Sequence, residues 1–238
     1  MTPSEHEDQL WLELPPISRR APKRLLVFLH GAGSCPEVFA PVAIAWQLKF
    51  PGATAAILQG LMPAAAGSGH DWFDMRGDTR RRAASVDKAV NELARRVKTV
   101  QDESGIDPCD TTLVGFSQGA TMALELARAH PRLSAIVVAY AGRLSRPIRD
   151  NEQMRPTVHL IHGELDSLVP VVHAKQALRG LQASGADVTL DIIEDGTHTI
   201  GQDMVIVGTT RVLQTVFRGR GRPTRNAGGR ATSAQVLH

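Results

Sequence analysis

Short apolar runs and amphipathic segments alternate along most of the chain. Apolar runs bounded by turn residues predict strands at residues 25–30, 53–58, 112–116, 133–140, 157–161 and 188–193. Apolar positions at helical spacing predict helices at residues 36–49, 81–103, 120–130, 171–184 and 203–217. Because strands and helices follow one another in this order, the pattern predicts an α/β fold with a mostly parallel central sheet and helices on both faces.

Two stretches depart from this alternation. Residues 60–80 are rich in Gly, Pro and Ala without periodicity, and a loop of this length inside a domain is usually functional or mobile. Residues 219–238 are rich in Arg and Gly and hold too few apolar residues to pack, which predicts a disordered tail. The 238 residues therefore predict one folded domain, residues 1–218, followed by that tail.

The positive charge of the chain is concentrated at its C-terminal end. Five arginines and no acid lie between Arg218 and the last residue, and subtracting these five charges from the formal net charge of +3 leaves about −2 for the rest. A body without excess positive charge does not predict a specific nucleic-acid partner. The tail could still make weak, non-specific contacts with nucleic acid.

The composition is that of an ordinary globular protein, with 42% apolar and 21% charged residues. No apolar run approaches the roughly 20 residues that span a bilayer, and the acidic N-terminal segment lacks the features of a secretory signal. Cys35 and Cys109 match neither a disulfide framework nor a zinc site. We therefore expect a cytoplasmic protein with two reduced thiols, no metal and no membrane span. The pattern does not indicate an oligomeric state.

A candidate nucleophile lies between a predicted strand and a predicted helix. Gly115-Phe116-Ser117-Gln118-Gly119 fits the pattern G-x-S-x-G, whose glycines allow a sharp strand-to-helix turn that exposes the serine hydroxyl at the carboxyl edge of a sheet. The alternative is a serine that only caps the helix N-terminus. The strand–turn–helix context favours the nucleophile.

Nucleophilic attack on a carbonyl also needs two N–H donors for the developing oxyanion. One is expected from the residue after the nucleophile, Gln118, and the other from the loop that follows an earlier strand. His30-Gly-Ala32-Gly33 suits that second position, with Ala32 favoured over Gly33 as the donor. A plain glycine turn and a dinucleotide-binding loop are the alternatives, but the third glycine of the nucleotide motif is missing.

The acid and the base are expected downstream, in the order Ser, Asp or Glu, His. Asp166 follows the strand at 157–161, and His198 follows the strand at 188–193, so both would lie at the same sheet edge as Ser117. Glu164 and Asp195 are the alternative acids. The other histidines are expected to have other roles. His30 would brace the loop after the first strand, and His159 and His162 would make buried hydrogen bonds. His130 ends a helix, and His70 and His173 could contact substrate.

Several motifs in order resemble one known family. The segments LVFLHGAG, WFD, GFSQGA, HLIHGELD and DIIEDGTH are similar to the bacterial carboxylesterases of the phospholipase/carboxylesterase branch of the α/β-hydrolase superfamily, which includes acyl-protein thioesterases. The resemblance covers roughly residues 25–217 and implies a fold without a large cap domain, no cofactor and activity on acyl esters. It differs at Ser34-Cys35-Pro36 and in the Arg-rich tail.

The resemblance also implies roles for individual residues. It carries over Ser117, Asp166 and His198 as a catalytic triad and Ala32 with Gln118 as oxyanion donors. Two aromatic residues, Trp72 and Phe73, match a pair near the acyl pocket, with ordinary core packing as the alternative.

The sequence thus predicts a serine carboxylesterase that hydrolyses esters of short to medium acyl chain length through an acyl-enzyme. The alternatives are an acyl-protein thioesterase or lysophospholipase, and a non-catalytic hydrolase-like binding protein. A dienelactone-hydrolase-like enzyme would carry cysteine at Ser117.

Overall fold

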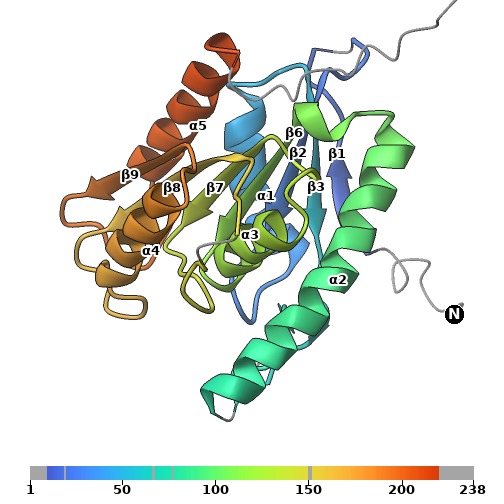
Figure 1. Cartoon of the computed structure of the whole chain (residues 1–238). Coiled ribbons are helices and arrows are strands. Elements are labelled where there is room, and N and C mark those ends of the chain that lie inside the picture. The colour runs from blue at the N-terminus through green and yellow to red at the C-terminus, as the bar shows by residue number, and fades with distance from the viewer. Residues whose placement is uncertain (1–9, 19, 66–67, 77, 150–151, 220–238) are drawn as a thin grey trace, which may run out of the picture.

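The computed structural model describes residues 10–18, 20–65, 68–76, 78–149 and 152–219, and its centre is a sheet of seven strands (Figure 1). The strand order in this sheet is β1-β3-β2-β6-β7-β8-β9. These strands are β1 (Trp11–Leu14), β2 (Arg24–Leu29), β3 (Ala53–Leu58), β6 (Thr111–Phe116), β7 (Ile136–Tyr140), β8 (Thr157–Gly163) and β9 (Val188–Ile193). All neighbouring pairs are parallel except β1 with β3.

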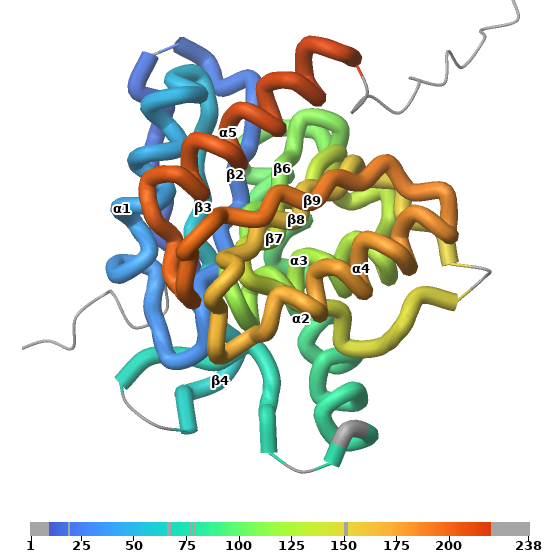
Figure 2. The backbone as a smooth tube through the Cα atoms, turned by 90° about the vertical axis from the view of Figure 1, so that its left-hand side faces the viewer, coloured from blue at the N-terminus to red at the C-terminus, as the bar shows by residue number. Residues whose placement is uncertain are grey.

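Helices cover both faces of the sheet. They are α1 (Pro36–Gln47), α2 (Thr79–Ser104), α3 (Gln118–Ala129), α4 (Val172–Ala183) and α5 (Gln202–Phe217). Alternate residues of β2 enter two separate cores. Leu25 belongs to the core that includes residues of α2, α3 and α4, whereas Leu26 belongs to the core that includes residues of α1 and α5. In Figure 2, which looks along the sheet from its β9 edge, α1 and α5 lie to the left of the strands and α3 and α4 to the right. The predicted mostly parallel sheet with helices on both faces is confirmed.

Strand β1 was not predicted from the sequence. It pairs antiparallel with β3, in a register that places Trp11 beside Leu58 and Leu14 beside Ala55. Four residues between an acidic segment and two prolines carry little strand signal by themselves. Their extended conformation depends on the free edge of β3, a long-range contact that local periodicity does not report.

The region from 60 to 80 contains a small second sheet. Strands β4 (Met62–Pro63) and β5 (His70–Asp71) pair antiparallel, and His70 forms an isolated bridge with Ser34. This hairpin therefore contacts the loop that follows β2. In Figure 2 it lies below the sheet, at the same end as the loop that follows β8.

The described part of the chain ends just beyond α5. Residues 220–238 lie outside the described residues, so the domain boundary at 218 and the tail stay predictions. Within the described residues, no helix is long and apolar enough to cross a membrane.

Candidate active site

Ser117 occupies the turn between β6 and α3 in a strained backbone conformation. Its φ is 53° and its ψ is −113°, a left-handed region that non-glycine residues rarely adopt. Such a conformation costs on the order of 1–3 kcal/mol and persists where the surroundings hold it. Here the Ser117 N–H donates to the carbonyl of Tyr140, 2.9 Å away, and ties the turn to β7.

The two glycines of the motif are required by close backbone approach. A Cβ at position 119 would lie 2.2 Å from the carbonyl oxygen of Leu29, and one at position 115 would lie 2.4 Å from the carbonyl oxygen of Gly119. Backbone atoms cannot move aside to relieve such a short contact without displacing the strand or the helix. The turn can therefore form only with glycine on both sides of Ser117.

The structure brings Ser117, His198 and Asp166 together in one hydrogen-bonded chain. Nε2 of His198 lies 2.9 Å from the Ser117 hydroxyl oxygen, and Nδ1 of His198 lies 2.7 Å from Oδ2 of Asp166. A neutral imidazole that donates from Nδ1 to the carboxylate leaves Nε2 to accept the serine proton. The ring of His198 also packs against Phe116, with 5.0 Å between ring centroids.

Asp166 is buried and fully engaged. Its Oδ1 accepts hydrogen bonds from the N–H groups of Leu168 and Val169, at 3.0 and 2.8 Å. Burial acts to raise the pKa of this carboxyl, but the hydrogen bonds from His198 and Val169 outweigh it and hold the pKa below its usual value. Asp166 therefore stays ionised beside His198. His162 supports the same loop through a 2.6 Å bond from Nε2 to the Val169 carbonyl.

The two alternative acids do not reach His198. Glu164 and Asp195 are exposed, and the carboxylate bonded to His198 is that of Asp166. The loops after β8 and β9 pack backbone against backbone, because the Leu165 N–H donates to the Gly196 carbonyl at 2.8 Å. Because of this contact between the two loops, Asp166 and His198 lie within hydrogen-bonding distance of each other.

The loop after β2 presents Ala32 as a free donor. The neighbouring Gly33 N–H is occupied, since it donates to Oδ1 of Asp71 at 2.9 Å and to the carbonyl of His70 at 3.0 Å. The N–H groups of Ala32 and Gln118 have no acceptor among the described residues. The geometry thus favours Ala32 over Gly33 as the partner of Gln118.

The side chain of Gln118 has a structural role that sequence reasoning missed. Its Oε1 accepts from the Trp72 N–H at 2.6 Å, and its Nε2 donates to the Phe73 carbonyl at 2.9 Å. The residue after the nucleophile therefore holds the 72–73 segment in place. The sequence signal that could have indicated this role is the polar side chain of Gln118 in the first turn of a helix, between two apolar segments.

The two aromatic residues predicted for the substrate pocket lie in different surroundings. Trp72 is 1% exposed, and its indole N–H donates to the His30 carbonyl at 2.8 Å. Phe73 lines a pocket beside α3. Their assignment to substrate binding stays a prediction, and the packing of Trp72 suits its alternative role in the core.

His30 braces the loop after β2. Its Nδ1 lies 2.7 Å from the Gly31 carbonyl, and its Nε2 accepts from the Gly60 N–H at 3.1 Å. Burial lowers the pKa of His30, which keeps the imidazole neutral and able to accept that bond.

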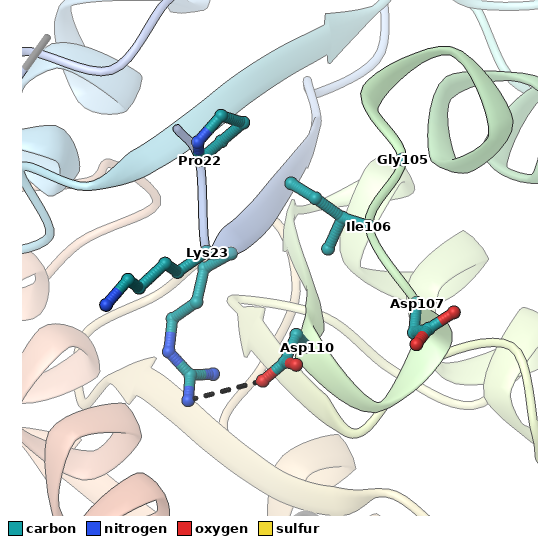
Figure 3. Close-up of a pocket in the computed structure, with 7 residues that line it drawn as sticks. Pro22, Lys23, Gly105, Ile106, Asp107 and Asp110 are labelled. Atoms are coloured by element: carbon teal, nitrogen blue, oxygen red, sulfur yellow. Dashed lines mark ion pairs between the residues drawn. The ribbon is translucent and has the colours of Figure 1, made fainter. Parts of the chain in front are cut away.

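Two pockets lie at opposite edges of the sheet. One, of about 250 Å³, borders α3 one turn beyond Ser117 and includes Phe73 and Thr121. The other, of about 420 Å³, lies at the amino ends of β2 and β6, where an ion pair of 3.6 Å joins Arg24 to Asp110 (Figure 3). The larger of these two pockets is remote from Ser117 and His198. We therefore take the smaller pocket, which lies near Ser117, as the candidate substrate pocket. In the described part of the chain, no cluster of three or more His, Cys, Asp or Glu could hold a metal ion.

Comparisons with known proteins identify a matching family and related esterases. Residues 17–209 match the family described as Phospholipase/Carboxylesterase. Esterase YpfH of Escherichia coli is 36% identical over 179 residues, which cover 75% of this chain and 77% of that protein. Acyl-protein thioesterase 1 of Saccharomyces cerevisiae is 28% identical over 180 residues, covering 65% and 76% of the two chains. The crystal structure of esterase PE8 superposes with a TM-score of 0.80 at 33% identity, over 86% of this chain and 97% of that one. The predicted α/β-hydrolase fold is therefore confirmed.

Proposed function

The chain belongs to the phospholipase/carboxylesterase family of esterases, and we propose that it hydrolyses acyl esters of short to medium chain length through an acyl-enzyme on Ser117. The observation that carries this proposal is the hydrogen-bonded chain from Asp166 through His198 to Ser117, with the serine at a strained turn. A serine, a base and an orienting carboxylate in this arrangement have the geometry of an activated nucleophile.

The reaction proceeds in two halves. Nε2 of His198 takes the proton of Ser117 while the hydroxyl oxygen attacks the acyl carbonyl, and the N–H groups of Ala32 and Gln118 stabilise the oxyanion. The protonated imidazole, stabilised by Asp166, gives its proton to the departing alcohol. Water then attacks the acyl-enzyme in the same way, and Ser117 is regenerated.

The preference for short to medium chains is supported by the pocket beside α3. Its volume of about 250 Å³ falls below the roughly 300–1,000 Å³ of pockets that enclose drug-sized ligands. A long acyl chain would have to extend into solvent. The chain is also similar in sequence to a yeast acyl-protein thioesterase. Thioesters are therefore a second candidate substrate class for the same three residues.

The test compares variants of the three residues with a matched control. Ser117→Ala and His198→Ala are expected to abolish hydrolysis of p-nitrophenyl butyrate and labelling by a fluorophosphonate. Asp166→Asn is expected to lose on the order of 10⁴-fold in kcat, because the imidazole is no longer held in the right tautomer. Ser184→Ala, which removes a hydroxyl from the end of α4, serves as the control and should keep full activity.

A series of p-nitrophenyl esters from acetate to palmitate tests the chain length, and a matched thioester tests the second class. Undiminished turnover by Ser117→Ala would refute the assignment of the nucleophile. A wild-type protein that neither labels nor turns over would favour the non-catalytic alternative.

A further inference from the structure

The pocket beside α3 combines an apolar lining with basic side chains. Its lining includes Phe73, Val86, Leu144, Arg82, Arg143 and His173. Among the described residues that line it, none carries a carboxylate. A hollow of about 250 Å³ with cations and no anions in its wall has an electrostatic preference for a negatively charged occupant.

Two acidic side chains near this lining along the chain, Asp74 and Glu125, are already paired with arginines. The carboxylate of Asp74 accepts two hydrogen bonds from the Arg76 guanidinium, at 2.9 and 3.0 Å. Glu125 is buried against Arg128 and also accepts from the Ser145 N–H at 2.7 Å. Neither carboxylate is therefore available to balance the charges in the pocket.

The two arginines of the pocket have no acidic partner within the described residues. Arg82, in the first turn of α2, makes one long contact of 3.5 Å from Nε to the backbone carbonyl of Asp78. Arg143, in the loop after β7, forms no ion pair with a described carboxylate. Both side chains are half-buried. Partial burial strengthens their attraction for an anion because solvent screens it less.

The loop that carries Arg143 is held in place by α3. Glu125 fixes the Ser145 N–H, and Arg128 donates to the Arg146 carbonyl at 3.2 Å. Two buried side chains of α3 therefore fix the backbone on the C-terminal side of Arg143. A guanidinium on a held backbone loses less conformational entropy when it binds a ligand.

The same pocket includes a residue of α3 that lies one helical turn beyond the candidate nucleophile. The Thr121 hydroxyl, in its wall, donates to the backbone carbonyl of Ser117 at 3.4 Å. Phe73, also in the lining, accepts a hydrogen bond at its carbonyl from the side chain of Gln118. A group held in this pocket would thus lie within about one helical turn of the candidate nucleophile.

We propose that the pocket formed by Arg82, Arg143 and His173 binds a negatively charged group of the substrate, so that the preferred substrates are esters that also carry a carboxylate or phosphate. This inference rests on the proposed esterase function and deepens it. The anion can belong to the acyl part or to the alcohol part of the ester, and the apolar residues contact the carbon chain between the anion and the ester bond.

The experiment uses the full chain and two matched pairs of esters. The first pair is mono-4-nitrophenyl adipate and 4-nitrophenyl hexanoate, which differ by a carboxylate at the end of the acyl chain. The second pair is 4-acetoxybenzoate and methyl 4-acetoxybenzoate, which differ by a carboxylate on the leaving group. We expect kcat/KM to favour the anionic member of one pair by about tenfold or more, as one charge-assisted contact would give. The pair that shows the preference identifies the part of the substrate in the pocket.

Variants assign the preference to the pocket. Arg143→Gln and Arg82→Gln are each expected to reduce the ratio of kcat/KM for the anionic to the neutral ester by about tenfold, mainly through KM. Arg143→Lys, which keeps the charge, should retain most of the ratio. Arg132→Gln removes an exposed arginine between α3 and β7, at the opposite edge of the sheet, and should leave activity and ratio unchanged. The ratio should also fall as salt is raised.

Each outcome decides a separate claim. Hydrolysis of the neutral esters with no anionic preference in either pair would overturn the inference and leave the proposed function intact. A preference that survives in both Arg143→Gln and Arg82→Gln would also overturn it. Failure of the wild-type chain to hydrolyse any of the four esters would overturn the proposed function and the inference together.

Discussion

At the scale of single residues, one carboxylate outside the candidate triad helps to hold the loop that carries Ala32, one of the two candidate oxyanion donors. Asp71 and the His70 carbonyl both accept the Gly33 N–H, and this arrangement fixes the turn in which Ala32 lies. Asp71 does not contact Ser117 or His198 in any described hydrogen bond. It is a positioning residue, and it comes from the 60–80 region that showed no periodicity in the sequence.

Removal of this carboxylate should impair catalysis through the position of the Ala32 N–H. Asp71→Ala is expected to lower kcat by about tenfold with little change in KM, because donors to the oxyanion act in the transition state. Asp71→Asn keeps an acceptor oxygen and should restore most of kcat. Steady-state kinetics on a p-nitrophenyl ester measure both. An alanine variant with normal kcat would show that the His70 carbonyl holds the turn alone.

A second residue, His159, links stability to pH. It is buried between the hydroxyls of Thr189 and Thr215, at 2.8 and 3.0 Å, and burial lowers its pKa to about 4. The unfolded state, with a histidine pKa near 6.5, binds the proton first as pH falls, so stability is lost between about pH 6.5 and pH 4. We expect this residue to cost about 3 kcal/mol of unfolding free energy between pH 7.5 and pH 4.

The measurement is urea unfolding of the wild type and of His159→Gln at pH 7.5 and pH 4. Glutamine can bond to a hydroxyl but does not titrate, so the variant should lose less stability over the same range. Other buried groups change both proteins alike and cancel in the comparison. Equal losses in the two proteins would contradict the assignment.

At the scale of elements, the tight turn between β6 and α3 depends on the backbone of β2. Gly119 lies where a Cβ would meet the Leu29 carbonyl oxygen at 2.2 Å, so Gly119→Ala should displace α3 and abolish fluorophosphonate labelling. Gly180 in α4 offers the matched control, because its Cβ would meet Ile148 at 3.5 Å, an ordinary contact. Gly180→Ala should keep labelling and raise the unfolding free energy by up to about 1 kcal/mol. Labelling of Gly119→Ala at the wild-type rate would refute the close approach.

At the scale of the whole molecule, every residue of the candidate site precedes the end of α5 at Phe217. A chain that ends at Gly219 is therefore expected to keep ester turnover within about twofold of the full chain. The four arginines beyond Gly219 are expected to contribute only salt-sensitive adhesion to nucleic acid. Activity and RNA retention at about 50 and 200 mM salt, compared between the two chains, test this. Activity lost with the tail would mean that the tail helps to form the site.

The sequence by itself determined the central architecture and the members of the candidate triad. Strands and helices depend on local periodicity, and each of the predicted elements from 25 to 217 is present in the structure, with ends displaced by a few residues. Ser117 could be predicted as the nucleophile because its turn needs glycine on both sides, and this requirement appears in the sequence as the pattern of residues 115–119. Asp166 and His198 could be named because parallel strands end at one edge of the sheet.

Tertiary structure alone decided how these residues are supported. The capture of Gly33 by Asp71, the bonds of the Gln118 side chain to the 72–73 segment, and the pairing of β1 with β3 join segments far apart in the chain. The convergence of Arg82 and Arg143 in one pocket is of the same kind. Local patterns report which elements form, because propensity and periodicity act over a few residues. Which side chains meet depends on the packing of whole elements, where each contact is set by all the others.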